Sequence, residues 1–298
     1  MKKILTLAVF FIVGHSAIAQ TADSLLNSMS KDNTNRPVAI FKSSRFILSQ
    51  TTETVKKKNL NFLVIHRFGD FAGANGGGKL YYGLDDVADV YLGFEYGLTD
   101  NLNIDIGRAT IGGLADLELK YAVLHQTSDG SSPIAITLLG ETGLRPYSTY
   151  TTLNDRLSYF GQVLIAHQFT PRIALQIAPS YVMDNTPIPL VVGVERNFFA
   201  LSATARIKVS KHMGFIVDYA HPFSSFRTRA NGFVDPLAFG IEIETGGHVF
   251  TMNISNARAI SEINYLSNTQ SRYSKGEYRI GFTISRIFDF NHKDETKK

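Results

Sequence analysis

The sequence of 298 residues contains no cysteine and no tryptophan. The lack of cysteine excludes disulfide bridges, thiolate metal ligands and a thiol nucleophile. Beyond residue 19 there is also no run of 18 or more apolar residues, so no transmembrane helix is expected there. The 13 Tyr and 21 Phe residues would have to supply any aromatic girdle at a membrane interface.

The chain also has little net charge. The formal net charge is +4, and it falls to +2 once Lys2 and Lys3 are subtracted with a signal peptide (4 − 2). Such a small excess does not favour nucleic acid or a strongly anionic surface as a partner. We therefore expect no nucleic-acid partner.

The first 19 residues have the pattern of a secretory signal peptide. Lys2 and Lys3 precede an apolar run from Ile4 to Val13, and Ala17-Ile18-Ala19 forms an A-x-A cleavage site. This apolar run is too short to span a bilayer. We expect export and a mature chain of 279 residues (298 − 19).

Twelve later segments alternate apolar with polar or small side chains, which is typical of strands with two different faces. Between Leu237 and Ser255, the alternation continues on both sides of Thr245-Gly246-Gly247, a sequence suited to a tight hairpin turn. Most segments exceed the about 9–11 residues with which a tilted strand crosses a membrane. The expected strands are Leu60–Phe68, Val87–Leu98, Leu102–Thr110, Leu114–His125, Ile134–Arg145, Arg156–Phe169, Ile173–Val182, Phe198–Val209, Met213–Phe223, Leu237–Glu244, His248–Ala257 and Tyr278–Phe290.

Tight turns and long polar loops alternate between these strands, except at the short connection Ile111–Gly113. Short turns on one side are typical of outer-membrane barrels, where they face the periplasm. The sequence therefore predicts an all-β fold, a closed antiparallel transmembrane β-barrel of about 12 strands, in preference to a soluble sandwich. A barrel of 14 strands that recruits Pro37–Val55 as a hairpin is the alternative.

The predicted barrel covers residues 59–290. Residues 20–58 lack regular alternation and are interpreted as a periplasmic lead-in segment, and residues 291–298 as a solvated tail.

If the apolar face meets lipid, the opposite face lines a lumen. Charges confined there must be paired or hydrogen bonded, so they form either an ion-pair network that fills the lumen or the wall of a charged pore. Glu242 and Glu244 lie two residues apart on one strand, and Arg279 is the cation considered for them although a strand intervenes. The predicted lumen residues are Arg67, Glu95, Asp105, Asp116, Glu118, Lys120, Glu141, Arg156, Gln162, Gln176, Arg206, Lys208, Asp218, Glu242, Glu244 and Arg279.

Three other patterns are weak. Gly73–Lys79 matches the spacing of a phosphate-binding loop, but Leu80 stands where Ser or Thr binds magnesium and no helix is expected. Asp85, Asp86 and Asp89 lack the spacing of a calcium loop.

A lipid hydrolase would need a serine beside a histidine near the lipid. The histidines with outward parity are His66, His167 and His248, and no serine pairs with them convincingly. We expect no catalytic residues, metal or cofactor.

Four stretches resemble a Bacteroidota outer-membrane β-barrel family of unknown function: Phe41–Arg45, Ile65–Gly69, Asp155–Tyr159 and Glu244–Phe250. The similarity runs from about Phe41 to the last strand. The resemblance implies an outer-membrane barrel of a Gram-negative bacterium, and it implies no activity or catalytic residue.

The expected function is a narrow porin-like channel or small-solute transporter with a charged lumen. The alternative is a closed structural or partner-docking barrel without transport, and an outer-membrane lipid hydrolase comes third. We expect a monomer in contact with outer-membrane lipid, with other envelope proteins as further partners.

Overall fold

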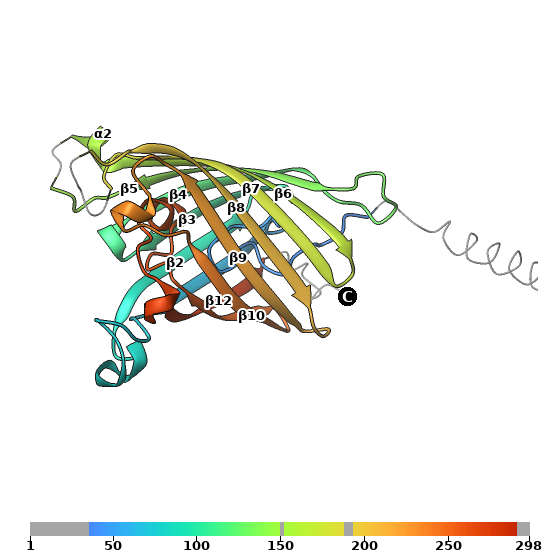
Figure 1. Cartoon of the computed structure of the whole chain (residues 1–298). Coiled ribbons are helices and arrows are strands. Elements are labelled where there is room, and N and C mark those ends of the chain that lie inside the picture. The colour runs from blue at the N-terminus through green and yellow to red at the C-terminus, as the bar shows by residue number, and fades with distance from the viewer. Residues whose placement is uncertain (1–35, 150–151, 188–192, 291–298) are drawn as a thin grey trace, which may run out of the picture.

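Twelve antiparallel strands close into one barrel in which β1 pairs with β12, as predicted (Figure 1). The computed structural model describes residues 36–149, 152–187 and 193–290, so the expected signal peptide and C-terminal tail lie outside the described residues. The strands are β1 (Asn59–Phe68), β2 (Val87–Gly97), β3 (Leu102–Ala109), β4 (Ala115–Leu124), β5 (Ala135–Leu144), β6 (Leu157–Thr170), β7 (Ile173–Asp184), β8 (Asn197–Lys208), β9 (Met213–Phe223), β10 (Leu237–Thr245), β11 (His248–Ser255) and β12 (Arg279–Asp289).

The two ends of the barrel differ in their connections. The turn end carries the tight turns, including β10–β11, where Gly246 and Gly247 have φ of 43° and 93° and glycine avoids a Cβ clash. The loop end carries the other connections, all but the β3–β4 one being long, and the short helices lie there: η1 (Gly78–Gly83), η2 (Ile111–Gly113), α2 (Leu153–Arg156), η3 (Arg229–Asn231), α3 (Glu262–Ser267) and η4 (Tyr273–Lys275). Among the described residues, no helix is long and apolar enough to cross a membrane.

The outer face of the barrel is apolar. On β2, Leu92 and Phe94 are exposed, while Tyr91 and Glu95 on either side of this pair are buried. The same alternation continues on β4, where Leu117 and Leu119 are exposed. A contiguous apolar surface of this kind is suited to lipid rather than to water.

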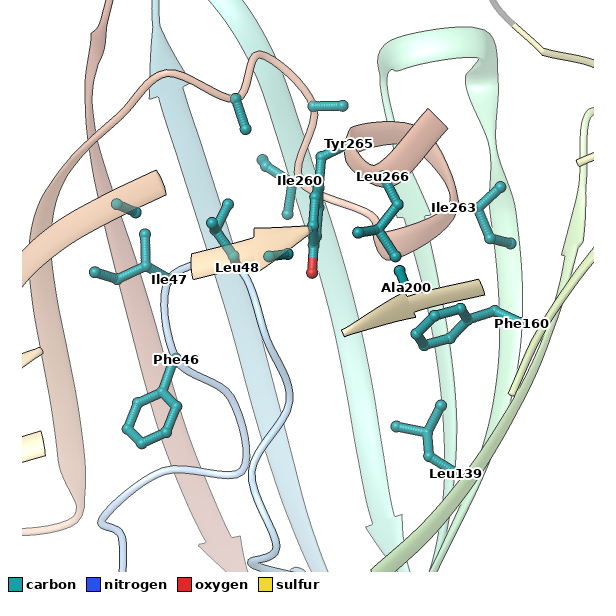
Figure 2. Packing of buried hydrophobic residues seen from close by; sticks show 14 of the residues in the cluster. Phe46, Ile47, Leu48, Leu139, Phe160, Ala200, Ile260, Ile263, Tyr265 and Leu266 are labelled. Atoms are coloured by element: carbon teal, nitrogen blue, oxygen red, sulfur yellow. The ribbon is translucent and has the colours of Figure 1, made fainter. Parts of the chain in front are cut away.

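Two segments from outside the strands fill the interior. Residues 40–55 enter from the turn end and are here named the plug hairpin, and residues 256–269, which include α3, enter from the loop end and are named the inward loop. Figure 2 shows Leu48 of the plug hairpin beside Ile260 and Tyr265 of the inward loop, and Phe46 and Ile47 belong to the same buried cluster.

The plug hairpin corrects the expectation of a lead-in segment wholly outside the barrel. Ile40, Phe41, Phe46, Ile47 and Leu48 are apolar, and the barrel interior removes them from water. The alternative of 14 strands is also wrong, because this segment pairs within itself and adds no strand to the closed sheet.

Candidate functional site: a plugged lumen and a polar vestibule

The tip of the plug hairpin is a tight turn. Phe46 N donates to Ser49 O (2.8 Å) and Thr51 N donates to Ser44 O (2.8 Å), so residues 44–51 fold back on themselves. These bonds satisfy backbone groups that water cannot reach in the interior. The hairpin can therefore lie inside the barrel without pairing with a strand.

Both limbs of the hairpin leave through the turn end. On the entering side, Val38 N donates to Gln126 O (2.7 Å) in the β4–β5 connection. On the returning side, Lys58 N donates to Gly97 O (2.8 Å) at the end of β2. The hairpin thus enters and returns through one opening, and its connection to β1 does not cross the lumen.

Asp218 of β9 anchors the hairpin tip. Its carboxylate accepts hydrogen bonds from Leu48 N (2.8 Å), Ser49 N (2.9 Å) and Ser49 Oγ (2.7 Å), and also from Thr204 Oγ1 (2.9 Å) on β8. The Asp218 side chain is fully buried and makes no ion pair in the described part of the chain. Bonds from backbone N–H groups therefore stabilise its charge.

The opposite wall holds the hairpin through predicted lumen residues. Glu95 accepts from Ser44 Oγ, and Lys120 Nζ donates to Ser44 O (2.8 Å). Gln50 Nε2 donates to Glu118 Oε2 (3.0 Å). The polar groups of these wall residues are thus hydrogen bonded to the plug hairpin.

The inward loop meets the hairpin near the middle of the lumen. Glu262 of α3 forms a 2.7 Å ion pair with Arg45, and both side chains are buried. Arg67 of β1 donates to Ile47 O (2.9 Å) on the hairpin and to Ala259 O on the inward loop. One wall arginine therefore joins both interior segments.

Burial opposes the charge of both members of the Arg45–Glu262 pair. For Glu262, burial raises the pKa of the carboxyl above its ordinary value, although Arg45 acts in the opposite direction. For Arg45, burial is outweighed by Glu262, Tyr91 and Glu118, so the pKa of the guanidinium is raised and Arg45 keeps its charge.

Arg45 also explains how an acidic wall is accommodated. Arg45 and Glu262 line a narrow space together with Asp116, Glu118 and Glu141, three predicted lumen residues that lie on the consecutive strands β4 and β5. The cation that faces these acids comes from the plug hairpin and not from another strand.

The structure places most of the predicted lumen residues in the interior. The buried ones are Arg67, Glu95, Asp105, Asp116, Glu118, Lys120, Glu141, Gln162, Gln176, Arg206, Asp218, Glu242 and Arg279. Lys208 and Glu244 are half-exposed near the turn end. The assignment of Arg156 was wrong: it belongs to α2, because Thr152 caps this helix by accepting from Asp155 N and β6 begins only at Leu157.

The partners of Glu242 and Glu244 differ from the expectation. Arg206 donates to Glu242 Oε1 through Nε (2.9 Å) and Nη2 (2.7 Å), and Lys42 of the plug hairpin pairs with Glu244 (3.0 Å). Arg279 lies at the loop end, where it forms a 2.5 Å ion pair with Asp70. The two glutamates therefore have separate cations and do not share Arg279.

Sequence reasoning also missed several interior residues. Asp89 was considered only as a weak calcium candidate, yet its carboxylate accepts from Thr110 Oγ1 (2.7 Å) and Ile260 N (2.8 Å) and so fixes the inward loop to β2. Arg145 donates to Asn264 Oδ1 (2.7 Å) of α3. The signal available for this region was the apolar group Ile260, Ile263, Tyr265 and Leu266 inside a connection otherwise rich in polar residues.

The loop end opens into a cavity of about 700 Å³, here named the vestibule. Ala259, Asn264 and Ser267 of the inward loop contribute to its lining, so the vestibule ends where the filled lumen begins. The other lining residues are Asp70, Asn75, Ile111, Gly112, Asp184, Gly232, Arg258, Asn268, Gln270, Ser271, Arg272, Lys275, Glu277 and Arg279.

The structure does not support a phosphate, metal or catalytic site at the weaker sequence patterns. Gly73–Lys79 lies in the β1–β2 loop and runs into the 3-10 helix η1. No cluster of metal-binding side chains occurs within residues 36–149, 152–187 and 193–290. The outward histidines contact aromatic rings, with His66 stacked on Phe282 (5.3 Å between centroids) and His248 on Phe250 (5.8 Å).

The apolar outer face, the closed strand order and the polar interior define a membrane-spanning β-barrel. The chain belongs to the family described as "Membrane bound beta barrel domain (DUF5777)", whose model matches residues 41–288. The match begins at Phe41, so nearly all of the plug hairpin belongs to the same domain as the strands. No curated protein sequence matches the chain.

Several solved structures are similar to this barrel. The NanC porin shares 12% identity and has a TM-score of 0.47, with 76% of this chain and 98% of that chain covered. The KdgM porin in complex with disordered oligogalacturonate shares 5% identity at a TM-score of 0.45, with coverages of 78% and 99%. An outer membrane channel from Pseudomonas putida F1 shares 12% identity at a TM-score of 0.47, with coverages of 80% and 98%.

Proposed function

We propose that the protein is a porin-like channel of the outer membrane that the plug hairpin closes, and that small polar solutes pass when the hairpin leaves the lumen. The observation that carries this proposal is the path of the hairpin. Its two limbs share the opening at the turn end, and it is hydrogen bonded into no strand pair of the barrel. Withdrawal would therefore break interior contacts and leave all twelve strand pairs intact.

The wall behind the hairpin supports passage of polar solutes. Withdrawal would uncover Glu95, Glu118, Lys120 and Asp218, which now bind the hairpin. A pore with charges of both signs on its wall discriminates among hydrated solutes by charge. The apolar tip residues would leave together with the hairpin.

The location is part of the same proposal. The apolar outer face and the membrane-barrel family support lipid contact, and the signal pattern in residues 1–19 supports export. We place the protein as a monomer in the outer membrane of a Gram-negative bacterium of the Bacteroidota, without catalytic activity.

A disulfide lock tests the proposal cleanly because the chain has no cysteine of its own. Ser44 Oγ of the hairpin lies 3.3 Å from Asn61 Nδ2 of β1, so Ser44→Cys with Asn61→Cys joins the hairpin to the wall. In planar bilayers, the reduced double variant should show conductance events and the oxidised form should lose them. The single variant Ser44→Cys is the control and should not respond to oxidant.

A second candidate is a closed structural or partner-docking barrel. It is favoured by the buried Arg45–Glu262 ion pair, which joins the plug hairpin from the turn end to the inward loop from the loop end in the middle of the lumen. Under this function, neither the native protein nor the reduced double variant conducts. Conductance that is equal in the oxidised and reduced forms would contradict the plug mechanism itself.

A further inference from the structure

The vestibule carries cations without partners. Arg258, Arg272 and Lys275 line it, and none of their side chains forms an ion pair or hydrogen bond with the described part of the chain. Arg258 also lines the adjoining cavity between the β1–β2 loop and β12. These three side chains are free to bind a ligand.

Most acidic side chains of the vestibule are paired with arginines. Asp70 is paired with Arg279 (2.5 Å), and Asp184 lies 3.7 Å from Arg145. Glu277 remains, and one of its oxygens accepts from the backbone N of Arg272 (2.9 Å). Three free cations against one acid leave a local excess of two positive charges (3 − 1), which favours an anion.

Neutral polar groups supply the second half of the site. Ser267 is 5% exposed, and its Oγ has no hydrogen-bond partner in the described structure. Asn268 Oδ1 is buried and has no partner there either. Both residues line the vestibule, and buried polar atoms without partners are uncommon because leaving them unpaired is costly. Rotation of these side chains toward the vestibule would let ligand hydroxyl groups satisfy them.

The size and the remaining lining restrict the ligand further. About 700 Å³ lies within the range of small-molecule sites, about 300–1,000 Å³. No aromatic side chain is among the described lining residues, and Ile111 and Ala259 are its main apolar members. The site thus offers charge and hydrogen bonds but no surface on which a flat ring would stack.

We propose that the vestibule binds a small organic anion with several hydroxyl groups, a hydroxylated carboxylate, at the mouth of the closed lumen. This proposal rests on the proposed channel function, since it names the class of solute that the channel would receive. Arg258 and Lys275 bind the carboxylate, while Ser267 and Asn268 bind the hydroxyl groups.

Calorimetric titration of the full-length protein in detergent tests the site without any transport step. Sodium gluconate is the probe, glucose is the neutral analogue with similar hydroxyl groups, and inorganic phosphate is an anion without them. Gluconate should bind at least about tenfold more tightly than either. Equal binding of glucose would refute the role of charge, and equal binding of phosphate would refute the role of the hydroxyl groups.

The double variant Arg258→Ala with Lys275→Ala should weaken gluconate binding by about tenfold or more. Lys211→Ala is the matched control, because Lys211 is an exposed cation in the β8–β9 turn at the opposite end of the barrel. Unchanged binding in the double variant would overturn the assignment. Gluconate binding without conductance would refute the channel and leave the site standing, whereas conductance without gluconate binding would refute the site alone.

Discussion

Asp218 offers the sharpest test of how firmly the plug hairpin is seated. Its carboxylate is the shared acceptor for Leu48 N, Ser49 N and Ser49 Oγ at the hairpin tip. Asp218→Ala removes all three bonds. The two backbone N–H groups then lie in the interior without an acceptor, and each costs about 1–3 kcal/mol.

The expected cost of seating the hairpin in Asp218→Ala is therefore about 2–6 kcal/mol from these two groups. Removing a buried carboxylate without a cation partner offsets part of this, because burying a charge is itself unfavourable. A net 3 kcal/mol corresponds to roughly a hundredfold increase in the withdrawn population. Asp218→Asn should have a smaller effect, since the amide oxygen still accepts from the backbone and only the charge is lost.

Limited trypsin digestion measures this population directly, because Arg45 is buried in the hairpin and becomes cleavable when the hairpin withdraws. Asp218→Ala should be cut faster at Arg45 and should show more frequent conductance events. Asp85→Ala is the matched control, as Asp85 is an exposed acid in the β1–β2 loop. If Asp218→Ala resists trypsin as well as the native protein does, the hairpin does not depend on this anchor and the reasoning is wrong.

Further predictions concern charges within the interior. Glu242→Gln leaves the buried Arg206 without its ion pair and should lower the free energy of unfolding by about 3–5 kcal/mol in urea titrations, whereas Glu244→Gln, at a half-exposed pair, should cost about 1 kcal/mol or less. Equal losses in the two variants would contradict the difference in burial. For Glu262, burial raises the pKa above its ordinary 4.5, so the folded state binds this proton more tightly and stability should fall as the pH rises above about 4.5 towards the raised pKa. Glu262→Gln should flatten this part of the stability profile, and a profile as steep as that of the native protein would show that other groups cause it.

The strands were predictable from the sequence because their alternation is long and regular. Segments such as Met213–Phe223 have the same bounds in the sequence prediction and in the structure. Each side chain of a barrel strand faces either lipid or lumen, so the parity of one residue fixes that of its neighbours. The burial of Glu118, Lys120 and Glu242 follows from this parity.

The filling of the lumen was not predictable by the same means. The plug hairpin and the inward loop contact the wall through single backbone groups, such as Leu48 N with Asp218 and Ile260 N with Asp89, and such contacts leave no periodic pattern. The available signal was compositional, since Phe46-Ile47-Leu48 is too apolar for a solvated leader. The prediction for Arg156 failed for a different reason. The four-residue helix α2 ends at Arg156, so β6 starts one position later than predicted.

The two interior segments are attached to the two strands that close the barrel. The plug hairpin leads directly into β1, the inward loop lies in the connection that leads into β12, and these strands pair from Asn59 with Asp289 to Arg67 with Gly281. The inward loop is bonded to Arg45 of the hairpin through Glu262 and to Arg67 of β1 through Ala259, so the two interior segments meet beside this seam. The segments that fill the lumen are thus the chain neighbours of the two strands that close it, so pairing of the first and last strands also brings the two interior segments together.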